Sequence, residues 1–231
     1  MIFLNRDDAG SRLAKKLRAY AGRNDVLVLG IPRGGVPVAF QVAADLYAPL
    51  DVFVVRKLGT PSQPELAFGA IASGGIRILD AQIVESMGIS EAEIERITAE
   101  ESKELDRRER AYRGGRAPLN IRNKIVILVD DGIATGASTR AAIAALRELK
   151  PAQIVLAAPM APASTCRHLR QEVDDLVCLE TPEPFYAIGA FYEDFSQVSD
   201  EEVTTLLRLN REHRGQQVAV AAHGTRKGVH S

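Results

Sequence analysis

Ile125-Val-Ile-Leu-Val-Asp-Asp-Gly-Ile-Ala-Thr-Gly-Ala-Ser-Thr139 is the stretch that decides the fold of this chain. Its first five residues are continuously apolar, which is typical of a strand that is buried on both faces of a sheet. Two adjacent carboxylates, Asp130 and Asp131, follow the strand. A loop of small and hydroxylated residues then leads into residues 138–149, whose apolar spacing predicts a helix.

The same succession of strand, loop and helix recurs on both sides of this stretch. Apolar runs that predict strands lie at 26–31, 51–55 and 153–158, and segments with helical spacing lie at 36–46 and 163–173. Strands that do not alternate in polarity and are interleaved with helices favour an α/β fold with a parallel-sheet core. Ligands of such sheets bind beyond the carboxyl ends of the strands, where Asp130 and Asp131 are predicted to lie.

Two segments depart from this succession. Residues 67–79 carry three glycines between short apolar pieces and predict a hairpin or a mobile flap. Residues 81–118 form a charged insertion, in which Ser90-Glu-Ala-Glu93 has the pattern of a capping box and opens a helix that runs to about Tyr112. The apolar stripe of this helix is thin, so we expect it to pack on the edge of the core or against a second subunit.

The C-terminal part of the chain is predicted to hold one last helix, at 200–210, with Ser199 as its cap. Residues 211–231 mix Gly, His, Gln and Arg without periodicity, which predicts a disordered tail. The functional domain is therefore predicted to span residues 1–210.

The composition is typical of a soluble globular protein. Of the 231 residues, 46% are hydrophobic and 26% are charged, and the formal net charge is -1, so no nucleic-acid partner is expected. The acidic start and the lack of any apolar run of ~18 residues predict a cytoplasmic protein without a membrane partner. Cys166 and Cys178 lack the number and spacing of a disulfide framework or a metal site, so we expect buried thiols.

The loop after the two aspartates has the composition of a phosphate-binding site. Ala134-Thr-Gly-Ala-Ser-Thr139 combines small residues, backbone N–H donors and hydroxyl groups with the positive end of a helix. It lacks the Gly-Lys-[Ser/Thr] ending of a P-loop and the three glycines of a dinucleotide fingerprint. Capping explains one aspartate, whereas a phosphorylated ligand with vicinal hydroxyl groups, such as a ribose 5-phosphate, gives both of them a partner.

On these residues the segment resembles the signature of type I phosphoribosyltransferases, in which two acids precede a Thr-Gly-x-[Ser/Thr]-Thr phosphate loop. Gly30-Ile-Pro-Arg-Gly-Gly-Val36 occupies the place of that family's pyrophosphate loop, where the resemblance puts a cis peptide at Pro32-Arg33. Val54-Val-Arg-Lys57 is similar to the end of the second strand in adenine- and orotate-type members. Residues 7–210 as a whole resemble a group of bacterial proteins of about this length that are described only by the phosphoribosyltransferase name.

The resemblance implies a fold and a set of roles. The fold would be a parallel-sheet core with a flexible flap, a charged helical insertion or lid at about 81–118, and a small hood formed near the N-terminus and by residues 180–198. The protein would use 5-phosphoribosyl 1-diphosphate and displace pyrophosphate by an unidentified, nitrogenous small-molecule acceptor. Mg²⁺ would be the cofactor, and dimers are common in the family, so a homodimer is expected.

The residues implied in these roles can be named in this chain. Those implied in catalysis are Asp130, Asp131, Arg33, Arg56 and Lys57, of which the two aspartates would hold the ribose hydroxyls and bind Mg²⁺ through water. Those implied in binding the 5-phosphate are Ala134, Thr135, Gly136, Ala137, Ser138 and Thr139. Those implied in binding pyrophosphate are Arg33, Gly34, Gly35, Arg56 and Lys57, and Glu65 is a candidate for a flap residue.

Three alternatives stay open at this level. Ala134 stands where 6-oxopurine enzymes carry an additional acid, which disfavours hypoxanthine or guanine, although adenine- and orotate-type members also carry alanine there. The aromatic residues of the segment 185–195 would either stack on an acceptor or fill the core, and core packing is favoured; they are Phe185, Tyr186, Phe191 and Tyr192. The same fold also serves regulators that bind phosphoribosyl diphosphate without catalysis.

Overall fold

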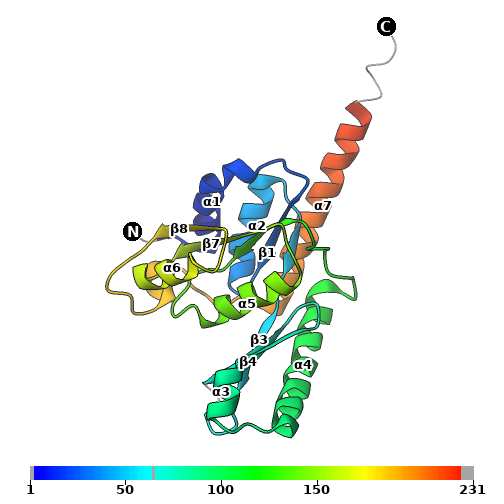
Figure 1. Cartoon of the computed structure of the whole chain (residues 1–231). Coiled ribbons are helices and arrows are strands. Elements are labelled where there is room, and N and C mark those ends of the chain that lie inside the picture. Colours follow the sequence, from blue (N-terminus) through cyan, green and yellow to red (C-terminus); the bar gives the residue numbers. More distant parts are fainter. Residues whose placement is uncertain (1–2, 64–65, 225–231) are drawn as a thin grey trace.

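The computed structural model describes residues 3–63 and 66–224, and two sheets organise them (Figure 1). The central sheet has five parallel strands in the order β2-β1-β6-β7-β8, which are Leu50–Val52, Val26–Gly30, Ile125–Val129, Gln153–Met160 and Asp175–Glu180. The second sheet is antiparallel and consists of β3 (Val55–Gly59), β4 (Ala67–Ala72) and β5 (Ile76–Leu79). The predicted α/β fold with a parallel core is confirmed.

The described residues also form seven α-helices. They are α1 (Arg6–Lys16), α2 (Gly35–Leu46), α3 (Ala81–Ser86), α4 (Glu91–Arg113), α5 (Ala137–Glu148), α6 (Ala163–Leu169) and α7 (Asp200–Gly224), with short 3-10 turns at Arg18–Tyr20 and Ile188–Phe191. Within residues 3–63 and 66–224, none of these helices has both the length and the apolar character needed to cross a membrane.

The strand β6 is the centre of the parallel sheet, and all five of its residues are buried. Side chains of a strand point alternately to opposite faces, so Ile127 packs with α1 and α2, whereas Leu128 packs with α5 and α6. β6 pairs with β1 in register, with Val129 opposite Gly30. The loops that follow these two strands therefore start side by side at one edge of the sheet.

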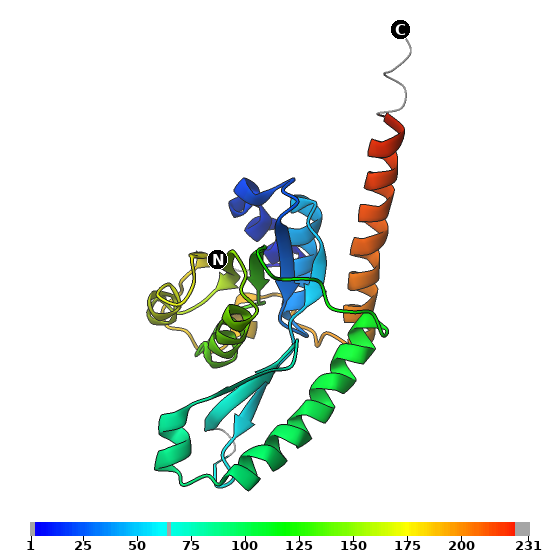
Figure 2. The same cartoon turned by 45° about the vertical axis from the view of Figure 1, so that its right-hand side comes forward.

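An arm, made of β3, β4, β5, α3 and α4, projects from the core, and the C-terminal part of α7 extends away on the opposite side (Figures 1 and 2). The arm sheet lies between two helices, because Phe68 and Ile71 pack with α4 while Ile76 and Ile78 pack with α5. The predicted hairpin at 67–79 is confirmed as β4 and β5. Gly74 and Gly75 form its turn with φ of +86° and +74°, a conformation that favours glycine.

The long helix of the arm has the ends that the sequence predicted. Ser90 accepts a hydrogen bond from the Glu93 N–H and Glu93 accepts one from the Ser90 N–H, which is a complete capping box. Gly114 closes the helix in a left-handed conformation, as is common at a helix C-terminus. The helix prediction for 90–112 is therefore correct to within one residue at its end.

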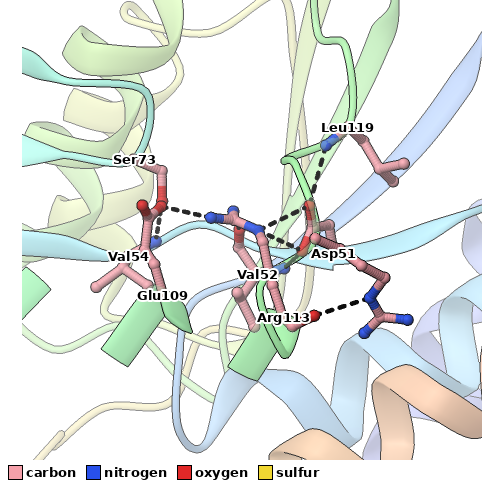
Figure 3. Close-up of polar contacts among 8 residues, drawn as sticks. Asp51, Val52, Val54, Ser73, Glu109, Arg113 and Leu119 are labelled. Atoms are coloured by element: carbon pink, nitrogen blue, oxygen red, sulfur yellow. Dashed lines mark hydrogen bonds and ion pairs between the residues drawn. The ribbon is translucent and has the colours of Figure 1, made fainter. Parts of the chain in front are cut away.

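The C-terminal end of α4 is fixed to the core by a buried ion pair (Figure 3). Arg113 Nε donates to both carboxylate oxygens of Asp51 on β2, at 3.1 and 3.2 Å, and Nη2 donates to the Val52 carbonyl at 2.9 Å. Glu109 accepts from Arg113 Nη1 at 2.6 Å, and the Leu119 N–H donates to Asp51 at 3.2 Å. The ion pair thus joins three segments: Arg113 connects the helix to the edge strand, and Asp51 also accepts from the chain that leaves the arm.

The predicted strand at 51–55 is divided between the two sheets. β2 ends at Val52, the Phe53 N–H donates to the Gly30 carbonyl, and Val55 already pairs with Ala72 of the arm sheet. The prediction that Arg56 and Lys57 lie at the carboxyl end of a strand of the parallel sheet was therefore wrong, since both belong to β3. The apolar run does not reveal the break because Phe53 and Val54 are buried as deeply as the strand residues.

The end of the chain also differs from its prediction. The helix predicted at 200–210 continues as α7 to Gly224, so residues 211–224 are helical rather than disordered, and residues 225–231 lie outside the described part. An ion pair between Arg208 and Glu212 at 2.8 Å supports the extension, although Glu212 and the next residues to 216 are exposed. An exposed helix lacks the apolar periodicity by which helices are predicted.

Candidate functional site

The two loops that the sequence singled out meet at the edge where β1 and β6 end. A β-carbon on Gly34 would overlap the carboxylate of Asp131, and one on Gly35 would lie 2.7 Å from the Val129 carbonyl and 3.0 Å from Asp130 Cα. The backbone of the Arg33-Gly34-Gly35 loop therefore rests directly on the acidic pair. The Pro32-Arg33 peptide bond is cis, as the resemblance implied.

Gly35 was predicted to bind pyrophosphate, and in the structure it also forms the contact between the loop and the end of β6. Its N–H donates to the Ile31 carbonyl at 3.0 Å, and Val36 N–H donates to the Arg33 carbonyl at 3.1 Å. The Gly35 N–H thus has a partner within the loop, and the role of Gly35 in binding pyrophosphate stays a prediction. Gly35 contributes by lacking a side chain, which allows α2 to begin against the end of β6.

The acidic pair is in an environment that opposes two negative charges. Burial and then the charge of Asp131 raise the pKa of Asp130 well above its usual range. Burial also raises the pKa of Asp131, and the hydrogen bond and charge of Arg6 act against that rise. The Asp130 carboxylate accepts from the Asp131 N–H at 3.0 Å, which fixes its orientation. A ligand that brings hydroxyl donors or a cation would relieve the repulsion between these groups.

Arg6 is the partner of Asp131, and no local sequence pattern points to it. Arg6 Nε lies 2.8 Å from Asp131 Oδ2, and each side chain is only 11% exposed. Arg6 opens α1, for which Asn5 is the cap and Asp7 and Asp8 are the first-turn acids. This cap could have predicted the helix, but nothing in it predicts a contact across 125 residues of sequence.

Aromatic residues of the predicted hood contact both Arg6 and Asp131. Tyr192 Oη donates to the Asp131 carbonyl at 2.6 Å, and the Arg6 guanidinium lies 3.9 Å from the centroid of the Phe195 ring. Tyr192 is buried against Phe3 and stacks on Phe195, whose centroid is 5.0 Å away. The prediction of core packing is confirmed for Tyr192, whereas Tyr186 is 84% exposed.

The predicted phosphate loop forms the start of α5. Gly136 is the residue before the helix, with φ of +78°, and Thr139 is buried. The other members of the loop are exposed, namely Ala134, Thr135, Ala137 and Ser138. The first backbone N–H groups of a helix have no partner within it and carry partial positive charge. The loop therefore offers an anion-binding surface beside Asp130 and Asp131 in the sequence and at the same edge of the sheet.

A threonine of the next helix supports this loop. Thr165 Oγ1, on α6, donates to the Ala134 carbonyl at 2.9 Å, and the Thr165 methyl group faces Gly136. No sequence pattern singled out Thr165, because α6 carries no signal beyond its apolar spacing. The hydrogen bond fixes the entry to the phosphate loop from a neighbouring element.

Arg33 remains accessible in the loop after β1. Its side chain is 39% exposed, and Nη1 lies 3.8 Å from Asp200 Oδ1 at the start of α7. The same oxygen accepts from Tyr112 Oη at 2.9 Å. Burial, followed by the contact with Asp200, raises the pKa of Tyr112 to about 12, so the phenol stays a donor near neutral pH. Arg33 is thus accessible, and its role in binding pyrophosphate stays a prediction.

The other predicted basic residues lie in the arm. Arg56 Nε donates to Glu101 on α4 at 2.6 Å, and Lys57 is exposed on β3. The Arg56 contact is with Glu101 and not with the aspartates, so the role of Arg56 and Lys57 in binding pyrophosphate stays a prediction. Glu65 lies outside the described residues. Cys166 is buried and Cys178 is partly buried, and both are free thiols, in keeping with the prediction.

The donor set fits a magnesium ion that arrives with its substrate. No group of three or more His, Cys, Asp or Glu side chains able to hold a metal occurs in residues 3–63 and 66–224. Asp130 and Asp131 supply carboxylate oxygens, but one oxygen of Asp131 is already taken by Arg6. Mg²⁺ keeps several waters and is often bound by one or two carboxylates together with substrate phosphates. These residues fit that mode of binding and not an all-protein site.

Comparison with known proteins agrees with the arrangement at this edge. The family described as "Phosphoribosyl transferase domain" matches residues 4–195. Two proteins from strains of Mycobacterium tuberculosis, "Putative phosphoribosyl transferase MT0597" and "Putative phosphoribosyl transferase Rv0571c", are each 45% identical over 213 residues. The match covers 92% of this chain and 47% of each relative, so the chain spans about half the length of these relatives.

A solved structure shows the same architecture. The crystal structure of TT1426 from Thermus thermophilus is 39% identical and superposes with a TM-score of 0.81. The match covers 90% of this chain and 98% of TT1426. The family match includes the acidic pair, the phosphate loop and the Gly34 loop, which the fold brings to one edge. This chain belongs to the type I phosphoribosyltransferase family.

Proposed function

We propose that this chain transfers a phosphoribosyl group from 5-phosphoribosyl 1-diphosphate to a nitrogenous acceptor and releases diphosphate. The observation that carries the proposal is the contact between the Gly34 backbone and the Asp131 carboxylate. It joins a loop suited to diphosphate with a pair of acids suited to ribose hydroxyls, at the edge from which the phosphate loop also starts. A ligand with a phosphate, a ribose and a diphosphate matches this sequence of groups.

The donor would be fixed by its two ends. Backbone N–H groups and hydroxyls of residues 135–139 would bind the 5-phosphate, while Arg33 and the Gly34 backbone would bind the diphosphate. Asp130 and Asp131 would accept hydrogen bonds from the ribose hydroxyls. Binding energy at these positions would hold C1 of the ribose in place for attack, which is how remote contacts raise a reaction rate.

The charges of the site suit the displacement at C1. As the bond from C1 to the diphosphate oxygen breaks, that oxygen takes the electron pair and the ribose ring gains positive charge. The acceptor nitrogen forms the new bond to C1 and loses its proton. Asp130 and Asp131 would stabilise the positive ring, and Arg33 would stabilise the leaving group. Mg²⁺ on the diphosphate would neutralise part of its charge, with the aspartates contacting the ion through water.

Two measurements test this function. Calorimetry with phosphoribosyl diphosphate, with and without Mg²⁺, should show binding that depends on the ion, and a screen of bases and amines should identify an acceptor by diphosphate release. Failure to bind at millimolar donor contradicts the proposal. Binding without turnover by any acceptor would support a regulatory protein that senses the donor.

A variant of the acidic pair gives a sharper result. Asp130→Asn combined with Asp131→Asn should abolish turnover, because both hydroxyl acceptors lose their charge, while circular dichroism shows a folded protein. Asp106→Asn, at an exposed position of α4, is the matched control and should keep full activity. Undiminished turnover by the double variant would refute the ribose assignment.

The homodimer and the cytoplasmic location stay predictions. Light scattering tests the homodimer.

A further inference from the structure

Arg6 is held in one orientation by three contacts, one with Asp131 and two with the adjacent residues Phe195 and Ser196. Its Nε donates to Asp131 Oδ2 at 2.8 Å and its Nη1 donates to the Ser196 carbonyl at 2.8 Å. The ring of Phe195 lies under the guanidinium, 3.9 Å from ring centroid to Cζ. A planar cation that is stacked on one face and hydrogen-bonded at two edges has little freedom to turn away.

Asp131 depends on this orientation because, among residues 3–63 and 66–224, Arg6 is the cation that forms an ion pair with it. Its carboxylate faces the α-carbon of Gly34, and its neighbour Asp130 is a second acid. Tyr192 donates to the backbone carbonyl of Asp131 and leaves the carboxylate free. Arg6 is therefore the cation that offsets the repulsion within the pair and determines where the Asp131 oxygens point.

We propose that Arg6 is a positioning residue of the phosphoribosyl site, which acts through Asp131 to aim the acidic pair at the ribose hydroxyls. This inference rests on the proposed function. Arg6 would act without touching the donor, because its contacts are with Asp131, Phe195 and Ser196. Its effect is on the recognition of hydroxyl groups, whereas the phosphate loop, held by Thr165 and α5, does not depend on it.

This division of roles predicts a selective loss. Ribose 5-phosphate should bind more tightly than 2-deoxyribose 5-phosphate or 3-deoxyribose 5-phosphate, by about tenfold for a hydrogen bond to a charged group. In Arg6→Met the affinity for ribose 5-phosphate should fall toward that for the deoxy sugars, so that at least one ratio drops to about twofold or less. The affinities for the deoxy sugars should stay nearly unchanged. A merely structural defect would weaken all three ligands together.

The experiment is calorimetry of the three sugar phosphates with the full chain. Arg6→Lys, which keeps the charge without the planar fork, should restore part of the lost discrimination. Lys16→Gln removes the same charge from an exposed position of α1 and should leave both ratios as in the wild type. Phe195→Leu keeps an apolar side chain but removes the ring under the guanidinium, and it should reduce the same ratio as Arg6→Met to a smaller extent.

Each result decides one question. Unchanged ratios in Arg6→Met would overturn the role of Arg6, and so would an equal loss of affinity for all three ligands. If Arg6→Met fails to fold, the ratios in Arg6→Lys and Phe195→Leu decide, and wild-type ratios in both would overturn the proposal. If the wild-type chain binds neither phosphoribosyl diphosphate nor any of these sugars, the proposed function itself fails.

Discussion

Gly34 is the residue whose lack of a side chain matters most to the site. Its α-carbon lies against the Asp131 carboxylate, and even a methyl group would force the loop or the aspartate to move. We expect Gly34→Ala to weaken donor binding by at least about tenfold, since a small displacement at a binding site is costly. Calorimetry with phosphoribosyl diphosphate and Mg²⁺ measures this loss. Gly215→Ala, with open space around the position, is the matched control and should bind normally.

Tyr112 predicts how stability responds to alkaline pH. Its pKa is raised from the usual value of 10.0 to about 12 in the folded chain. The protonated phenol therefore contributes stability that is complete below pH 10 and is lost as the pH rises through 12. The free energy of unfolding, measured in urea across about pH 9 to 12, should fall less steeply in Tyr112→Phe. Tyr47→Phe, at a side chain that is 61% exposed, should leave the slope unchanged.

The sequence predicted those site residues that belong to a local sequence pattern. Asp130, Asp131 and Gly34 stand at the ends of apolar runs, and the rule that ligands bind at carboxyl ends of strands was enough to group them. Arg6 and Thr165 were not found, because each acts through a contact with a distant segment, and their own surroundings in the sequence are those of ordinary helix residues.

At the scale of elements, the arm depends on how α4 is fixed to β2. Replacing one partner of a buried ion pair leaves the other charge without compensation, which typically costs about 3–5 kcal/mol. Arg113→Met should therefore lower the free energy of unfolding by about that amount, since Asp51 would stay buried. Denaturant titration followed by circular dichroism measures it. Arg110→Met, on an exposed side of the same helix, should change stability little.

A double variant checks the cause of that loss. Asp51→Asn combined with Arg113→Met should be more stable than the sum of the single effects predicts, because no uncompensated charge remains. Strict additivity would show that the two residues do not act as a pair. A second cycle, of Arg113→Met with Glu109→Gln, would then test the other side-chain partner of Arg113.

The boundaries of elements were predictable where a cap or a breaker marks them. Ser90 and Gly114 gave α4 its ends, whereas the break between β2 and β3 has no breaker residue and depends on pairing with Ala72. The edge strand β8 was not predicted, since it is only partly buried and its apolar run is limited to the four residues 176–179. Helix α1 was missed for a related reason, because polar residues dominate its sequence.

At the scale of the whole molecule, the donor should stabilise the core that holds its site. A ligand that binds only the folded state at about 100 times its Kd adds about 2.7 kcal/mol to the free energy of unfolding. A melting curve with phosphoribosyl diphosphate and Mg²⁺ should therefore shift upward by several degrees. The Asp130→Asn, Asp131→Asn variant should show a smaller shift, and an equal one would separate donor binding from the acidic pair.

The parallel sheet could be predicted for the whole molecule because its strands are nearly uniform in polarity and alternate with helices. The arm was foreseen only as a flap and a charged insertion at 81–118. Its three strands are short, and its sheet becomes evident only when α4 and α5 cover opposite faces. The family relatives from Mycobacterium tuberculosis are about twice as long as the match, so the chain corresponds to about half of each of them.

The length of α4 also affects how a movement of the arm would be transmitted to the core. Its 23 residues span about 34 Å at about 1.5 Å per residue, and Tyr112 and Arg113 lie at the end next to the core. A rotation of about 10° around that end would carry the far end through about 6 Å. Conversely, a displacement of several ångströms at the far end would rotate Tyr112 slightly. Tyr112 contacts Asp200, and Asp200 contacts Arg33, so the rotation would affect both residues. A movement of the far end of the arm would therefore be transmitted, reduced in size, to the loop that we propose binds the diphosphate.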